Sequence, residues 1–114
     1  MEYGSGGTTG VDLKRSDNPT TPQGFELHQN YPNPFNPTTT ISYSLEKTAN
    51  VTLKIYNIRG ELVTTLVDSR QAMGSHSVIW NGTDMNSSRV SSGIYIYCLD
   101  VNTTRLVKKM TLLK

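Results

Sequence analysis

Residues 51–67 read VTLKIYNIRGELVTTLV and contain the clearest structural signal of the chain. In the first half, Val51, Leu53 and Ile55 alternate with more polar residues, which is the period of a strand with one buried face. Residues 57–60 then supply a turn, and Gly60 can adopt the positive φ that a tight turn requires. Residues 61–67 are the expected partner strand, so this stretch predicts a β-hairpin. Within that partner, Val63 and Leu66 are three apart, which breaks the period of two and predicts a β-bulge.

Short apolar alternations of the same kind continue on both sides of the hairpin, separated by turn signals about every ten residues. Strands are expected at residues 25–29, 39–45, 51–56, 61–67, 75–80, 93–99 and 105–113. Residues His76, Val78 and Trp80 share one face of their strand, and we expect Trp80 to be largely buried. Because no window combines a helical stripe with helix caps, the pattern predicts an all-β fold, an antiparallel sandwich of about seven strands.

The chain of 114 residues has room for one small domain. Residues 1–24 are rich in Gly, Thr, Ser and Pro and contain Val11 and Leu13 as their only aliphatic residues. So little apolar surface cannot offset the entropy of ordering the segment. We therefore expect residues 1–24 to be a flexible linker, or a tail left by cloning, and residues 25–114 to form the folded domain.

Composition excludes several classes of protein. No stretch approaches the roughly 20 apolar residues of a membrane-spanning helix, so no membrane insertion is expected. The net charge of +2, from 11 basic and 9 acidic residues, is too balanced for a nucleic-acid partner. A single cysteine, Cys98, allows neither an intrachain disulfide nor a thiolate metal cluster. The first ten residues do not have the pattern of a secretory signal peptide, so an exported protein would contain this chain as a fragment.

No catalytic constellation stands out in the sequence. The two histidines, His28 and His76, lie outside any nucleophile motif, and we expect neither an enzyme nor a cofactor. The loop after Trp80 gathers oxygen ligands, which makes Asn81, Asp84 and Asn86 a weak candidate site for a hard cation such as calcium. The stronger interpretation of this Asn- and Gly-rich loop is a tight turn, because calcium loops commonly carry several carboxylates.

Residues 30–37, NYPNPFNP, differ in kind from the rest of the chain. Three prolines fix φ and remove three backbone donors just before an expected strand. One interpretation is a corner between two sheets, in which Tyr31 and Phe35 plug one end of the sandwich. The other is an exposed recognition epitope. Physical reasoning alone favours the corner.

Five segments together resemble a known family. They are FELHQNYPNPFNPT at residues 25–38, VTLKIYNIRG at 51–60, GSHSVIWNG at 74–82, SGIY at 92–95 and KMTLLK at 109–114. In this order and spacing they resemble the type A C-terminal sorting domain of substrates of the type IX, or Por, secretion system, over residues 22–114. The stretch from Trp80 to Tyr95 is also similar to the Ig-like module of flagellar hook-capping proteins.

The resemblance implies an Ig-like β-sandwich attached to an N-terminal passenger domain of a bacterial exported protein. It implies outer-membrane secretion machinery and a sortase-like protease as partners, with transit through the periplasm before display on the outer-membrane surface or release. The sorting-motif positions that it transfers to this sequence are Pro32, Asn33, Pro34, Gly60, Val63, Gly93, Tyr95, Lys109 and Lys114. One position departs from the family pattern, since Ser87 stands where a glycine is usual.

A second function remains open, that of an Ig-like adhesive or carbohydrate-binding module of a secreted hydrolase. Tyr56, Tyr95 and Tyr97 could supply the aromatic platform of such a site. Alternation, however, places Tyr95 and Tyr97 on the side of Leu99, which favours the core.

The last expected strand carries four cations and no acidic side chain, with Leu106, Met110 and Leu112 available for the core. The cations are Arg105, Lys108, Lys109 and Lys114. Lys108 or Lys109, together with Lys114, would then form a positive stripe that a receptor senses, or would merely protect a sheet edge from aggregation.

Overall fold

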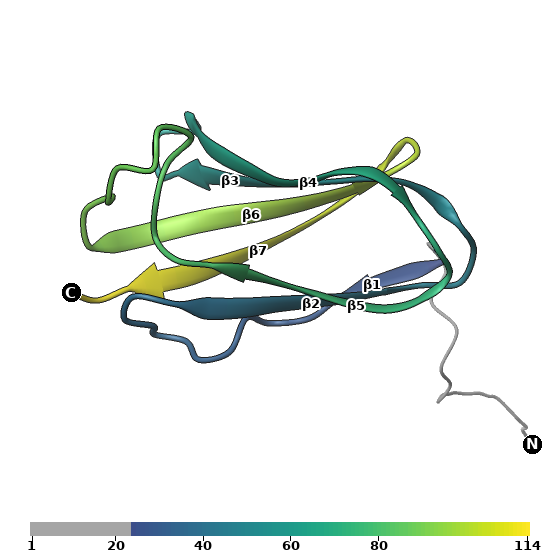
Figure 1. The fold of residues 1–114 in the computed structure, drawn as a ribbon, viewed down its shortest axis with the longest axis horizontal. Helices are drawn as coiled ribbons and strands as arrows, with labels where there is room; N and C mark the ends of the chain where they lie inside the picture. The colour runs from purple at the N-terminus through teal and green to yellow at the C-terminus, as the bar shows by residue number, and fades with distance from the viewer. Residues whose placement is uncertain (1–23) are drawn as a thin grey trace, which may run out of the picture.

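The computed structural model describes residues 24–114, which form seven strands in two antiparallel sheets with no helix among them (Figure 1). The expected linker, residues 1–24, lies outside the described residues except for Gly24. The strands are β1 (Phe25–Leu27), β2 (Thr39–Leu45), β3 (Ala49–Asn57), β4 (Leu62–Gln71), β5 (Gly74–Trp80), β6 (Gly93–Val101) and β7 (Thr104–Leu112).

The strands pair in the orders β1-β2-β5 and β4-β3-β6-β7, and the two sheets face each other across one core. All seven predicted strands are present, and the predicted all-β sandwich is confirmed. Several boundaries differ from the sequence analysis by one or two residues, and the end of β4 differs by four. The strand β1 ends at Leu27 rather than Gln29, because the chain turns there toward the prolines, although the His28 amide still donates to the Ser42 carbonyl at 3.0 Å. The strand β4 continues to Gln71 by pairing with the beginning of β3.

The predicted irregularity in β4 is confirmed and occurs twice. The register between β3 and β4 passes over Leu66 and then over Val63, so that two residues of β4 face one of β3 at each point. Val63 is buried and Leu66 packs against the core. The two bulges therefore turn both Val63 and Leu66 inward, despite their spacing of three.

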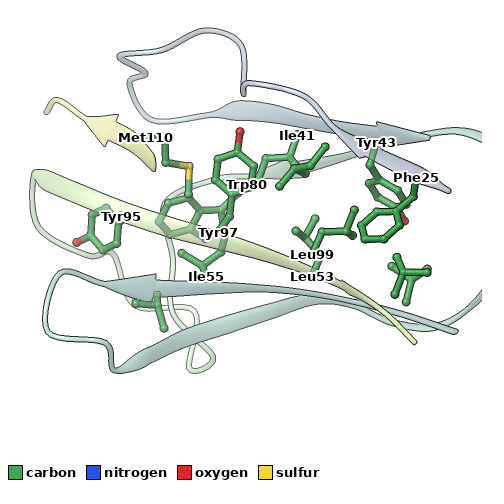
Figure 2. Close-up of a cluster of buried hydrophobic side chains, with 14 of the residues drawn as sticks. Phe25, Ile41, Tyr43, Leu53, Ile55, Trp80, Tyr95, Tyr97, Leu99 and Met110 are labelled. Carbon is green, nitrogen blue, oxygen red and sulfur yellow. The ribbon is translucent and has the colours of Figure 1, made fainter. Parts of the chain in front are cut away.

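Trp80 occupies the centre of an aromatic cluster at one end of the core (Figure 2). It is 1% exposed, with its ring centroid 5.3 Å from that of Tyr95 and 5.6 Å from that of Phe35. The indole N–H donates to the Thr83 carbonyl at 2.9 Å, so the only polar atom of the ring is satisfied. The buried Trp80 joins strand β5 to β6 and to the segment that precedes β2.

Gly82 allows the chain that leaves β5 to pass close to the prolines. Its φ is +76°, and a Cβ atom there would lie 3.2 Å from the Pro37 carbonyl oxygen. Both the backbone conformation and the close approach therefore favour glycine.

Replacing Trp80 with alanine should lower the free energy of unfolding by about 3–5 kcal/mol, because it leaves a large cavity in the core. Urea denaturation followed by circular dichroism measures this change. Ile79→Ala is the matched control, since Ile79 is the neighbouring residue on the same strand and is 63% exposed; its effect should stay within about 0.5 kcal/mol. A loss below about 1 kcal/mol for Trp80→Ala would contradict the central position of the ring.

Candidate recognition surface

The Tyr97 hydroxyl anchors residues 28–37, which we call the proline segment, to the core. Tyr97 is fully buried on β6, and its hydroxyl accepts a hydrogen bond from the Asn30 amide and donates one to the His28 carbonyl, both at 2.8 Å. Burial raises the pKa of Tyr97 to about 12, so the hydroxyl keeps its proton at neutral pH. One side chain thus satisfies a donor and an acceptor of a segment that makes few strand contacts of its own.

Asn30 extends this anchor to the prolines. Its side chain is 2% exposed, and its amide nitrogen donates to the Thr39 hydroxyl at 2.9 Å and to the Pro32 carbonyl at 3.1 Å. Thr39 in turn donates to the same Pro32 carbonyl at 2.8 Å. A buried polar network of this kind is stable because each member has a partner, and it fixes the position of Pro32.

The following residues cover the free edge of β7. The Asn33 side-chain oxygen accepts from the Thr111 amide at 3.0 Å. The Phe35 amide donates to the Thr111 carbonyl and the Phe35 carbonyl accepts from the Leu113 amide, both at 2.9 Å. Gln29 adds a hydrogen bond to the Lys109 carbonyl at 2.8 Å. The first and the last sorting motifs of the sequence are therefore one structural unit.

The corner interpretation of this segment is correct for Phe35 and wrong for Tyr31. Phe35 is 1% exposed and plugs the end of the core against Trp80. Tyr31 is 81% exposed, because its backbone pairs with Thr40, whose neighbours Thr39 and Ile41 point into the core. Residues directly opposite each other project to the same side of a sheet, so the Tyr31 ring points to solvent.

The motif positions between these two ends are structural. Gly60 has a φ of +83° in the turn from β3 to β4, where its amide donates to the Asn57 carbonyl at 2.9 Å. Val63 is a core residue. Gly93 begins β6 with a φ of +154°, and the Tyr95 hydroxyl donates to the Ser91 carbonyl at 2.7 Å. These residues hold the loops of one end of the sandwich in place.

Of the four cations between Arg105 and Lys114, Lys109 and Lys114 remain available at the motif-bearing end of β7. Lys109 is exposed and lies across from Ile96 on the outer face, whereas Lys108 lies across from the buried Tyr97 and is half-buried. Arg105 binds both carboxylate oxygens of Asp100, at 2.7 and 3.1 Å, and this contact lowers the pKa of Asp100. The expected stripe thus reduces to the side chains of Lys109 and Lys114. A groove of about 380 Å³ runs beside Lys109, between Gln29, Asn33 and Ile94.

All nine motif positions gather toward one end of the sandwich, where β3, β5 and β7 end and β2, β4 and β6 begin. We call it the motif end. The strand β1 starts at the opposite end, where Phe25 pairs with Leu45 (Figure 1). The chain therefore enters the domain at the end remote from the motifs.

The motif end also exposes large apolar side chains that sequence reasoning missed. They are Tyr31, Ile58, Leu62, Met85, Ile94 and Leu113, each at least 40% exposed. Ile58 is the most open among the aliphatic ones at 71%, and it lies with Ile94 along a groove of about 280 Å³. The available signal was an isoleucine inside the polar turn at residues 57–60, where burial is not expected.

The candidate cation loop forms a self-contained turn. The Asp84 carboxylate accepts from the amides of Asn86 at 2.9 Å and Ser88 at 3.0 Å, and the Asn81 side chain accepts from the Thr83 hydroxyl at 2.6 Å. Residues 24–114 contain no group of three or more His, Cys, Asp or Glu residues placed to hold a metal. Ser87 adopts a φ of +65°, so serine takes the left-handed conformation for which glycine would be favoured.

An aromatic platform for carbohydrate is not formed by the three tyrosines considered. Tyr95 and Tyr97 are buried, while Tyr56 is half-buried on the outer face of β3, across from Ile96. The rings therefore lie on opposite faces of one sheet.

Among solved structures, the chain is similar to dimeric latent PorU from Porphyromonas gingivalis, with 23% identity and a TM-score of 0.67 over 78% of this chain. It is also similar to PorZ of the same organism, with 22% identity and a TM-score of 0.56 over 77% of this chain. The chain spans only 9% of the PorU chain and 11% of the PorZ chain.

A third similar structure is FlgD from Xanthomonas campestris, with 20% identity and a TM-score of 0.54, covering 76% of this chain and 64% of FlgD. At these identities the three structures establish the fold, and the predicted likeness in fold to the hook-capping protein is confirmed. Residues 24–114 contain no helix that could cross a membrane. No curated protein matches the chain.

The family model described as "Secretion system C-terminal sorting domain" matches residues 29–112. The match covers most of the chain, includes the proline segment and β7, and confirms the resemblance noted in the sequence. The chain therefore belongs to the family of secretion-system C-terminal sorting domains, and its role is that of a sorting signal for secretion.

Proposed function

We propose that residues 25–114 address an N-terminal passenger to the type IX machinery of the outer membrane, with residues 1–24 as the connection. The passenger crosses the periplasm, the machinery carries it outward, and a sortase-like protease removes the domain before surface display or release. The family match supports the sorting role on which this proposal rests. So does the likeness in fold to PorZ, which is described as a bacterial surface component of the type-IX secretion system.

The observation that carries the proposal is that the chain enters the domain at one end while the motif positions lie at the other. The motif positions lie at the end opposite to the start of β1. A passenger attached before Phe25 therefore joins the domain at the end opposite to the motif end. A signal that serves as a detachable address needs this separation between cargo and recognition surface.

Within the motif end, shape and contact are supplied by different residues. Asn33, Gly60, Val63, Gly93 and Tyr95 act through hydrogen bonds, turns and core packing. The contacts with the machinery come from the exposed neighbours of these residues, namely apolar side chains such as Ile58 and Ile94 and the cations Lys109 and Lys114. Apolar contacts surrounded by charge are the usual composition of a specific protein interface.

The charge of the motif end can be tested by the double substitution Lys109→Glu with Lys114→Glu. The chain is fused behind a signal peptide and a fluorescent passenger in a host with type IX machinery, and fluorescence outside the cells is measured. We expect export to fall while the purified variant unfolds within about 0.5 kcal/mol of the parent, because both side chains are exposed.

The matched control is Lys47→Glu with Arg70→Glu, which makes the same change of charge at the opposite end. This variant should be exported like the parent. Equal export of both double variants would show that the lysines only protect the edge of β7, and equal export with and without the domain would contradict the sorting function itself.

The apolar part of the surface can be tested by Ile58→Ser in the same export assay. Loss of a central apolar anchor commonly weakens an interface by more than about 1 kcal/mol. Export should therefore fall several-fold with unchanged thermal stability. Met73→Ser is the control, since Met73 is 65% exposed in the turn at the other end. If Met73→Ser lowers export as much as Ile58→Ser, the effect comes from general surface polarity and not from recognition.

A further inference from the structure

The outer edge of β5 is an open hydrogen-bonding surface. The strand lies at the margin of the three-stranded sheet, and all seven of its residues, Gly74–Trp80, are in register with β2. On its other side, no segment among residues 24–114 pairs with it.

The backbone groups that face outward follow from the alternation of an antiparallel ladder. The Ser42 carbonyl accepts from the His28 amide, so the peptide groups of Ser42 face β1. Those of its neighbours Ile41 and Tyr43 then face β5, where their partners are Val78 and His76. The N–H and C=O groups of the alternate β5 residues consequently point away from the sheet. These residues are Ser75, Ser77 and Ile79.

The other sheet edges are all protected in a recognisable way. The strand β1 is only three residues long and carries Glu26. The strand β4 has two bulges and exposes Asp68 and Arg70. The proline segment covers the end of β7. Shortness, bulges, charges and covering segments are the common devices that keep strand edges from pairing with other chains.

None of these devices is present on β5. The strand reads GSHSVIW, without Lys, Arg, Asp, Glu or Pro, and its register with β2 is continuous. Its outward side chains are two exposed serines and Ile79, which is 63% exposed. A regular, uncharged edge with an exposed isoleucine is the arrangement that accepts an added strand.

We propose that β5 pairs with the β5 strand of a second copy of this chain, antiparallel about a two-fold axis at Ser77. The outward-facing residues are symmetric about this position, so Ser77 meets its own equivalent and Ser75 meets Ile79 of the other copy. The small side chain of Ser75 thus lies across from the large side chain of Ile79. The edge carries no charge, so neither repulsion nor an opposite charge directs it to a different partner. The pairing joins the two three-stranded sheets into one, with the isologous geometry of a two-fold dimer.

The contact is limited to one strand edge, which is smaller than the roughly 1,200 Å² at the lower limit of standard interfaces. A weak dimer that forms with increasing concentration is therefore expected. Sedimentation equilibrium of the whole chain, from micromolar to millimolar protein, measures this association. Hydrogen exchange under the same conditions identifies the edge, because the amides of Ser75, Ser77 and Ile79 should become protected as concentration rises. The amides of His76 and Val78, which face β2, should be protected throughout.

Two lysine substitutions provide a matched pair. Ser77→Lys places two like charges together at the axis and should reduce association at least tenfold. Ser42→Lys places the same charge on the same face of the sheet, on the strand adjacent to β5, and should leave association unchanged. Both substitutions remove the same contact between the Ser42 and Ser77 hydroxyls, 3.4 Å apart, so any loss of stability from that source is equal.

A chain that stays monomeric at millimolar concentration would overturn the proposal. So would a dimer that Ser77→Lys and Ser42→Lys affect equally, since the copies would then meet at another surface.

Ser77→Cys tests the register, because hydrogen-bonded antiparallel partners have Cα atoms about 5.5 Å apart, within the range of a disulfide. Oxidised dimer should form with Ser77→Cys and not with Ser42→Cys. Burial of Cys98 raises the pKa of its thiol and keeps it from competing. A dimer in which Ser77→Cys does not cross-link would contradict the axis.

Discussion

The two hydrogen bonds of the Tyr97 hydroxyl hold together the parts of this domain that are distant in sequence. They connect the middle of β6 to the backbone of residues 28–30, which would otherwise run past the sheet with unsatisfied groups. From there the order of contacts is continuous. Asn30 positions Pro32, Asn33 and Phe35 pair with the end of β7, and Phe35 closes the core against Trp80. The end of β7 therefore depends on Asn30, a residue near the beginning of the domain.

Because of this dependence, most of the sorting-motif positions have structural roles. A motif recognised in sequence suggests residues that touch a receptor, yet in this domain most of the motif positions are turns, core residues or hydrogen-bond partners. They specify the shape of the motif end. Under the proposed function, the exposed residues beside them make the contacts with the machinery. On that proposal, a substitution at Gly60 or Tyr95 would impair recognition through the fold, whereas a change at Ile58 or Lys109 would act on contact alone.

Much of the fold could be predicted because alternation with a period of two is a local property. It located the seven strands, the inward face of β5 with Trp80, and the burial of Tyr95 and Tyr97. The bulges in β4 could be anticipated from the spacing of Val63 and Leu66. The burial of Asn30 could not, because a buried amide is stable only with partners, and those partners come from distant positions such as Thr39 and Tyr97. The exposure of Tyr31 depends on register with a neighbouring strand. The separation of Lys108 from Lys109, by contrast, follows from alternation, because Lys108 shares the face of Leu106 and Met110. The conformation of Ser87 could not be predicted either, because the loop imposes a positive φ on a residue type that does not favour it.

Native-state hydrogen exchange of Tyr97→Phe tests most directly whether the Tyr97 hydroxyl holds the end of β7. Leaving the buried groups of residues 28–30 without partners costs roughly 1–3 kcal/mol, which corresponds to an increase of about 5- to 150-fold in local opening. We expect faster exchange at the amides of Phe35, Thr111 and Leu113, beyond any change at the amides of the β3–β6 ladder, which serve as the internal reference. If the Asn30 amide alone exchanged faster while those three amides kept their protection, the proline segment would hold β7 without Tyr97, which would contradict the central role of this hydroxyl.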